Sequence, residues 1–162
     1  MDNIININDF TGIFAIPINN NVDREELQTM IDKVCMFDLK NILTKNLYEA
    51  FEDNPLEDRF VAITDDLKYI LKTRVYYYYI ANKCGLVGSN YSSNTVKVDT
   101  ASIQPVRVTI RKAESMYNKG IDVYNDLMDK FFEEENTYPE FDGNEAVAVF
   151  SYYWMYKKDS IL

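Results

Sequence analysis

The sequence predicts an all-α core of three main helices and one short helix, with extended or β-forming arms at both ends. Apolar residues recur at the three-and-four spacing of a helical face in three long stretches, and proline, glycine and asparagine mark the breaks between them. With 162 residues and 47% apolar content, the chain suits one domain with a real core. We divide it into an N-terminal arm (1–21), a helical domain (22–143) and a C-terminal tail (144–162).

The N-terminal arm is rich in isoleucine and phenylalanine but shows no helical period. Gly12 and Pro17 interrupt it, and a short strand is predicted at 13–16. Phe10, Phe14 and six isoleucines make the arm too apolar for a free tail. We therefore expect it to lie on this domain or on a neighbouring molecule.

The first helix is predicted at Asp23–Leu43, followed by a short helix at Leu47–Phe51 and a loop at 52–57. Asp23 and Glu26 have the spacing of a capping box at the helix start. An apolar stripe then follows the helical repeat, made by Leu27, Met30, Ile31, Val34 and Phe37. The short helix is expected to direct Leu47, Tyr48 and Phe51 inward.

The central helix is predicted at Asp65–Cys84, with Thr64 as its N-cap and Gly85 just beyond its end. Its middle carries four consecutive tyrosines, Tyr76–Tyr79. At about 100° per residue these point in four directions, so the helix is apolar most of the way round. Tyrosine can also lie half-exposed with its hydroxyl in water. For the run as a whole, we expect contact with both the core and a partner molecule.

This surplus of aromatic surface predicts contacts between subunits. Tyrosine and tryptophan are enriched at protein interfaces. The segments expected to make these contacts are the two arms and the loop at 85–104, whose length of roughly 20 residues is unusual inside a compact domain. The candidate interface residues are Phe10, Phe14, Tyr76, Tyr77, Tyr79, Tyr153 and Trp154.

The longest helix is predicted at Pro105–Glu135, because its apolar residues follow the helical repeat closely. Pro105 is tolerated in a first helical turn, where no N–H donor is needed. Pro139 and Gly143 then end the helical stretch. The segment 145–156 is short, apolar and β-prone, so it is predicted as a strand or extended tail, with a helix as the alternative.

The charge balance excludes a protein that grips nucleic acid. The net charge is −9, and no dense cluster of lysine and arginine is present. An acidic surface is compatible with lying near DNA without holding it. Cys35 and Cys84 are expected to be reduced in an intracellular setting. No apolar run approaches the roughly 18 residues of a membrane span, so no membrane partner is expected.

The residue types of the chain give little support for a catalytic site. The chain has no histidine, which removes the commonest general base and most zinc sites. It also has no glycine pattern for binding phosphates. We expect no enzyme activity, no catalytic residues, no cofactor and no metal site.

Four carboxylates form one line on the longest predicted helix. Asp122, Asp126, Asp129 and Glu133 are spaced four, three and four residues apart. They are expected to lie on a solvated outer face, opposite the apolar stripe. A metal site is disfavoured, because ligands along one helix face do not surround an ion. A third interpretation is an acidic wall that repels DNA in a channel.

The order of these elements resembles the small, mostly helical connector proteins of tailed bacteriophages, also called head-completion or adaptor proteins. The resemblance covers about residues 10–141 and rests on apolar patterns and element order. The matching segments are Phe10-Thr11-Gly12, Ile16-Pro17, Asn41-Ile42-Leu43, Leu47–Phe51, Val75–Ala81, the Ser/Asn-rich loop, Ala113, Tyr117-Asn118, Phe131-Phe132 and Thr137–Phe141.

This resemblance implies a non-enzymatic ring subunit in the neck of a virion, assembled in the host cytoplasm. Such proteins stack in about a dozen copies under the portal protein, extend the DNA channel and receive the tail. The implied partners are copies of the chain, the portal protein and further connector or tail proteins. DNA would pass nearby without specific binding, and the acidic strip at residues 122–133 would face the channel.

Two other classes of function remain open from the sequence. An acidic inhibitor of a host nuclease, or DNA mimic, should be a monomer or dimer with carboxylates spaced like phosphates. An enzyme with a carboxylate-based site should instead hold two carboxylates with raised pKa values in a closed pocket.

Overall fold

The computed structural model describes residues 4–16, 18, 21–83 and 100–144, and side chains in the last helix from 109 onward. This part of the chain is mostly helical and contains no strand. It forms two short 3-10 helices and four α-helices: η1 (Ile7–Asp9), η2 (Gly12–Phe14), α1 (Asn21–Leu43), α2 (Lys45–Asp53), α3 (Asp58–Lys83) and α4 (Thr100–Glu133). The predicted helical core of three long helices and one short one is confirmed. The tail at 145–162 lies outside the described residues.

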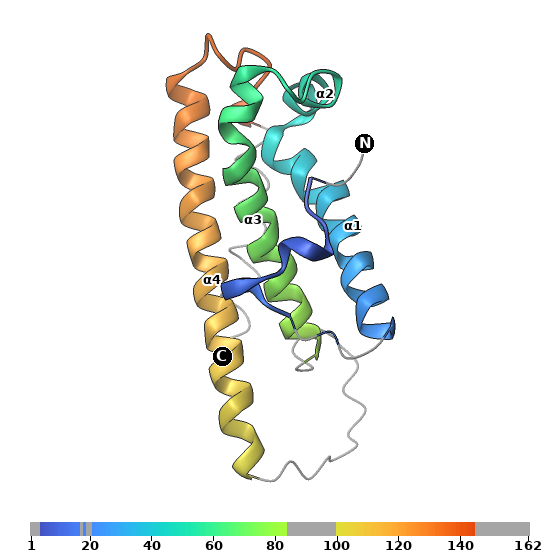
Figure 1. Ribbon diagram of the computed structural model, residues 1–162. Coiled ribbons are helices and arrows are strands. Elements are labelled where there is room, and N and C mark those ends of the chain that lie inside the picture. Colours follow the sequence, from blue (N-terminus) through green and yellow to red (C-terminus); the bar gives the residue numbers. More distant parts are fainter. Residues whose placement is uncertain (1–3, 17, 19–20, 84–99, 145–162) are drawn as a thin grey trace.

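The long helices form an antiparallel bundle with α3 in the middle (Figure 1). α4 packs along one side of α3 and α1 along the other, while α2 lies at the end where α3 begins and α4 finishes. The first turns of α4 project beyond the last turn of α3 (Figure 1). The two helix pairings explain why α3 is apolar around most of its circumference: it has a neighbour on each side.

Several predicted boundaries differ from the observed ones. α3 begins at Asp58, seven residues before the predicted Asp65, and Thr64 lies inside the helix with its hydroxyl donating to the Phe60 carbonyl at 2.8 Å. α4 begins at Thr100, so Pro105 is not in its first turn. The predicted loop at 85–104 is therefore shorter at its C-terminal end, and residues 84–99 lie outside the described part.

The N-terminal arm folds back onto the helices. The strand predicted at 13–16 is not formed, because the chain makes the 3-10 turn η2 there, with Gly12 at a φ of 60°. η1 contacts α1, and η2 contacts α3. The arm thus contributes to the same apolar core as the helices, through the buried side chains of Ile5, Phe10, Phe14 and Ile16.

A single threonine separates α1 from α2. Thr44 has a φ of 63°, a left-handed conformation that is unusual for a residue other than glycine. It is buried, and its hydroxyl accepts a hydrogen bond from the Asp142 backbone N–H at 3.3 Å. This turn lets Leu47 and Phe51 enter the core from α2, as the sequence predicted for both.

The core between α1, α3 and α4 is dense and apolar. Its fully buried side chains include Leu27, Ile31, Leu43, Leu47, Phe60, Ile63, Leu67, Leu71 and Phe131. α3 and α4 approach closely where Gly120 faces Thr73; a Cβ on Gly120 would lie 2.9 Å from the Thr73 Cβ. Within the described residues, no helix is both long and apolar enough to cross a membrane.

Candidate functional site

The tyrosine run of α3 is largely covered by the chain itself. Tyr76 and Tyr79 are buried, with Tyr76 only 3% exposed, and Tyr77 and Tyr78 are partly buried. The Tyr77 ring lies 4.8 Å from the Tyr117 ring of α4, between ring centroids. Burial raises the pKa of Tyr77 and of Tyr79. Tyr76, Tyr77 and Tyr79 thus take part in the intramolecular packing around α3. Their additional contact with a second subunit stays a prediction.

The two candidate interface residues of the N-terminal arm are also buried within the chain. Phe10 packs in the common core, and Phe14 is 4% exposed. The Phe14 ring meets Tyr69 edge-on at 5.6 Å and Tyr76 at 6.2 Å, between centroids. Of the two places that the sequence allowed for the arm, this structure shows the one on its own domain. Tyr153 and Trp154 lie outside the described residues.

A buried ion pair joins α3 to α1. Arg74 Nη1 lies 2.8 Å from Asp38 Oδ2, and both side chains are about one-tenth exposed. Burial would lower the pKa of Arg74, but the Asp38 carboxylate outweighs it, so that pKa is raised and the guanidinium stays charged. Sequence reasoning missed this pair. Its only signal was a charged residue on the apolar stripe of each helix.

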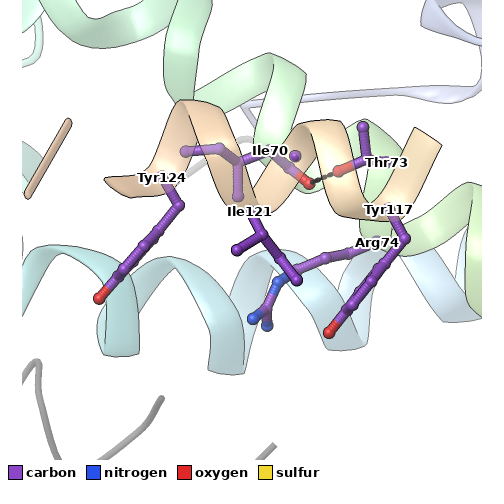
Figure 2. A pocket seen from close by; sticks show the side chains of 7 residues that line it. Ile70, Thr73, Arg74, Tyr117, Ile121 and Tyr124 are labelled. Atoms are coloured by element: carbon purple, nitrogen blue, oxygen red, sulfur yellow. Dashed lines mark hydrogen bonds between the residues drawn. The ribbon is translucent and has the colours of Figure 1, made fainter. Parts of the chain in front are cut away.

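A small pocket lies beside this ion pair, between α3 and α4 (Figure 2). Arg74, Thr73, Tyr117 and Tyr124 give it polar groups, and Ile70, Gly120 and Ile121 complete its lining. Burial raises the pKa of Tyr124 to about 12, so its hydroxyl is protonated at neutral pH. The space suits about one water molecule and is too small for a metabolite.

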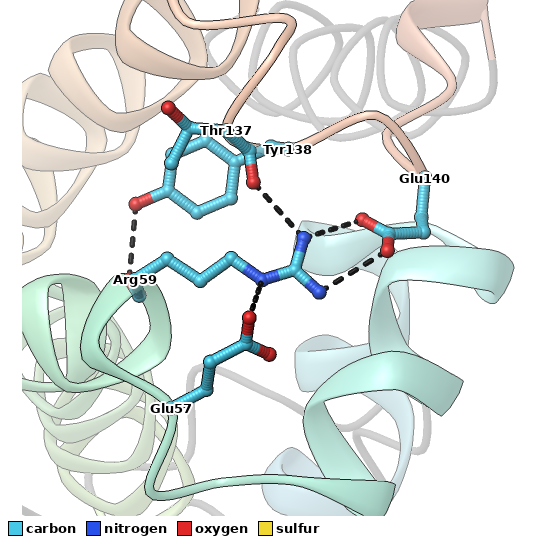
Figure 3. A network of polar contacts seen from close by, with 5 residues as sticks. All are labelled: Glu57, Arg59, Thr137, Tyr138 and Glu140. Carbon is cyan, nitrogen blue, oxygen red and sulfur yellow. Dashed lines mark hydrogen bonds and ion pairs between the residues drawn. The ribbon is translucent and has the colours of Figure 1, made fainter.

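A polar network fastens the turn after α4 to the start of α3 (Figure 3). Arg59 binds Glu140 through two hydrogen bonds, of 2.8 and 3.1 Å, and donates to the Thr137 carbonyl at 2.9 Å. Its Nε also lies 3.1 Å from a Glu57 carboxylate oxygen. The Tyr138 hydroxyl donates to the Arg59 carbonyl at 3.0 Å. The hydrogen bonds from Arg59 lower the pKa of Glu140.

The four carboxylates of α4 lie where the sequence predicted, on an outer face. Asp122, Asp126, Asp129 and Glu133 are all exposed. In the described part of the chain, no three or more histidine, cysteine, aspartate or glutamate residues are grouped as ligands for a metal ion. Whether this strip faces a channel stays a prediction.

Several large apolar side chains reach solvent in the described part of the chain: Ile13, Ile18 and Val22 near its start, and two groups on the helices. Leu56 (86% exposed), Val61 and Phe132 lie where α3 begins and α4 ends, at one end of the bundle (Figure 1). Met36 (61% exposed) and Phe37 (58% exposed) are adjacent on α1. The sequence assigned Phe37 to the inward stripe of this helix, and that assignment is wrong. The buried face of α1 passes through Val34, Asp38 and Leu39 instead.

Comparison with known proteins gives no relative on which to base a function: no family model, no curated protein and no solved structure matches this chain.

Proposed function

We propose that this protein is a structural ring subunit of a tailed-phage virion, bound below the portal protein, where it extends the DNA channel and joins head to tail. About twelve copies would form the ring. The proposal is supported by the resemblance in element order, by the helical core and by the surface features described above. It requires contacts of two kinds: sideways between copies, and endwise to the layers above and below.

The observation that carries the proposal is the placement of exposed apolar side chains on two different surfaces. Single exposed apolar residues are common on monomeric proteins and need no explanation. Here, however, Leu56, Val61 and Phe132 share one end of the bundle, and Met36 and Phe37 share the flank of α1. An end suits contact with another layer, and a flank suits contact with the neighbouring copy.

The charge of the chain supports a place beside DNA rather than a grip on it. The net charge is −9, and four exposed carboxylates follow α4 from Asp122 to Glu133. A protein that holds duplex DNA neutralises phosphates with lysine and arginine. An acidic wall does the opposite: it repels the backbone and lets packaged DNA slide.

The deciding experiment is electron microscopy of particles assembled in cells that produce this chain. We expect density for the chain in a ring on the portal axis, between the portal protein and the tail. Density elsewhere on the particle, or particles that lack the chain, would contradict the proposal.

The alternative of an acidic nuclease inhibitor is favoured by one observation, the line of exposed carboxylates on α4. Their arrangement reproduces little of DNA, however. The four carboxylates form a single line on one helix, whereas duplex DNA presents two strands of phosphates. A monomeric chain that inhibits host nucleases in stoichiometric amounts would establish the alternative.

A further inference from the structure

The N-terminal arm packs on α3 through the Phe14 side chain. The Phe14 side chain inserts between Tyr69 and Tyr76, whose rings both meet it edge-on, at interplanar angles of 78° and 80°. The Lys72 ammonium lies 5.1 Å from the centroid of the same ring. We call Tyr69, Lys72 and Tyr76 the arm-binding face.

The arm keeps its shape through its own hydrogen bonds. In η1, the Asn6 side chain accepts from the Asn8 N–H at 2.9 Å, and Asp9 accepts from the Asn6 N–H at 2.7 Å. In η2, the Phe14 N–H donates to the Thr11 carbonyl at 3.1 Å. Since these bonds are local, the arm can present the same buried side chains to any copy of the arm-binding face.

A second copy of the chain is the partner that fits this face. Each copy carries the same arm and the same face, so an arm placed on a neighbour repeats every contact seen within one chain. The sequence between Ile16 and α1 is only Pro-Ile-Asn-Asn, residues 17–20. Four residues span at most about 14 Å when extended, so the neighbour has to lie close to the start of α1.

The arm makes an apolar contact with the helices. Four large side chains of residues 4–16 are buried on the helices, namely Ile5, Phe10, Phe14 and Ile16. The side chains of Met36, Phe37 and Leu56, by contrast, are exposed. If arms are exchanged, the apolar contact that each arm makes within its own chain is formed between two subunits instead.

We propose that the arm-binding face takes residues 4–16 of a neighbouring copy when subunits assemble. This inference rests on the proposed ring, since a ring supplies a neighbour at a fixed position. It names the contact that closes the ring: the arm of one subunit lies on α3 of the next.

The experiment is photo-cross-linking with the full-length chain. The variant Phe14→p-benzoylphenylalanine places a photoreactive ring at the Phe14 position, against the tyrosines of α3. This unlabelled variant is mixed in equal amounts with nitrogen-15-labelled wild type, warmed to allow exchange, concentrated until oligomers form and then irradiated. Mass spectrometry of the digested product tells whether the linked α3 peptide is light, from the variant population, or heavy, from the wild type.

With arms on neighbouring copies, about half of the linked α3 peptides should be heavy. The matched control is Ile13→p-benzoylphenylalanine, because Ile13 belongs to the same turn but is 60% exposed. It should give at least tenfold fewer links to α3. Linked peptides that stay light at every protein concentration, with or without oligomers, would overturn the proposal.

The outcome also separates this inference from the proposed function. Heavy cross-links in a chain that electron microscopy does not find on the portal axis would keep the arm exchange and remove the connector role. A ring on the portal axis with light cross-links alone would keep the connector role and remove the arm exchange.

Discussion

Asp38 supplies the α1 half of the buried ion pair between α1 and α3. Its carboxylate lies 2.8 Å from Arg74 and balances a guanidinium that is almost out of water. Desolvating two charges is expensive, and their attraction repays the cost only while both are present. The pair therefore contributes more to fixing how the helices align than to net stability.

We predict that Asp38→Ala lowers the free energy of unfolding by about 3–5 kcal/mol, because Arg74 keeps its buried charge and loses the nearby carboxylate. Urea unfolding followed by circular dichroism measures the loss. The control is Glu25→Ala on the exposed face of α1, expected to lie within about 0.5 kcal/mol of wild type. A loss below about 1 kcal/mol in Asp38→Ala would contradict the prediction.

Gly120 sets the distance between α3 and α4. Alanine is normally the better helix former, by about 1 kcal/mol. Here its Cβ would collide with the Thr73 side chain, including Cβ at 2.9 Å. We predict that Gly120→Ala lowers stability by about 1–2 kcal/mol net, since overpacking outweighs the gain in helix propensity.

Thermal or urea unfolding checks this, with Asn118→Ala as the control on the solvent side of the same helix. That control should be neutral or slightly stabilising. If Gly120→Ala were as stable as Asn118→Ala, the close approach of the two helices would not limit the packing.

At the scale of elements, the Arg59 network closes the bundle where α4 ends. It joins the first turn of α3 to the turn at Thr137–Glu140, so the chain after α4 is held against the bundle (Figure 3). Two parallel hydrogen bonds between guanidinium and carboxylate add direction as well as energy.

We predict that Glu140→Gln lowers stability by about 1 kcal/mol at pH 7 and by less at pH 3. The pKa of Glu140 is lowered in the folded state, so its contribution is present above the unfolded pKa and is lost as pH falls through the folded pKa. Urea unfolding at several pH values gives the difference between variant and wild type.

The control for this pH series is Glu135→Gln, an exposed residue just after α4. Its difference from wild type should be small at every pH. A Glu140→Gln difference that stayed constant between pH 7 and pH 3 would contradict the role given to the Arg59–Glu140 pair.

The helices themselves followed from local sequence, with informative exceptions. The repeat of apolar residues in α1, α3 and α4 predicted three long helices because each buries a stripe on its neighbours. The start of α3 was missed by seven residues. Asp65 looks like a helix start, but Phe60 and Ile63 are fully buried, and the helix extends about two turns further toward the N-terminus. The start of α3 is therefore decided by the burial of these two side chains and not by the cap-like residues at 64–66.

At the scale of the whole molecule, the surface rather than the core bears on assembly. We predict that the double variant Met36→Ser/Phe37→Ser keeps the stability of wild type within about 0.5 kcal/mol, since both side chains are mainly exposed. It should associate less with itself, because the flank of α1 is the surface proposed for contact between copies. Light scattering measures this self-association.

The matched control changes two polar residues of the same helix that are also exposed, Lys33→Ser and Asn41→Ser. This control should associate as wild type does. Equal association of both double variants would remove the α1 flank from the candidate contact surfaces.

The tyrosine run of α3 shows what the sequence could not predict. Four consecutive tyrosines in one helix predict cover on several sides, part of it from a neighbouring molecule, and the contact with a neighbour stays a prediction. The sequence could not tell which molecule covers them. In the described chain, the arm covers Tyr76 and α4 contacts Tyr77.

By itself, the sequence determined the helical class, the number of main helices, the acidic outer face of α4 and the absence of histidine chemistry. Periodicity, composition and charge are local properties, so they can be read without coordinates. The tertiary structure alone decided the buried Arg74–Asp38 pair, the fold-back of the arm and the exposure of Met36 and Phe37. These depend on which residues distant in sequence meet, and a one-dimensional pattern does not specify that.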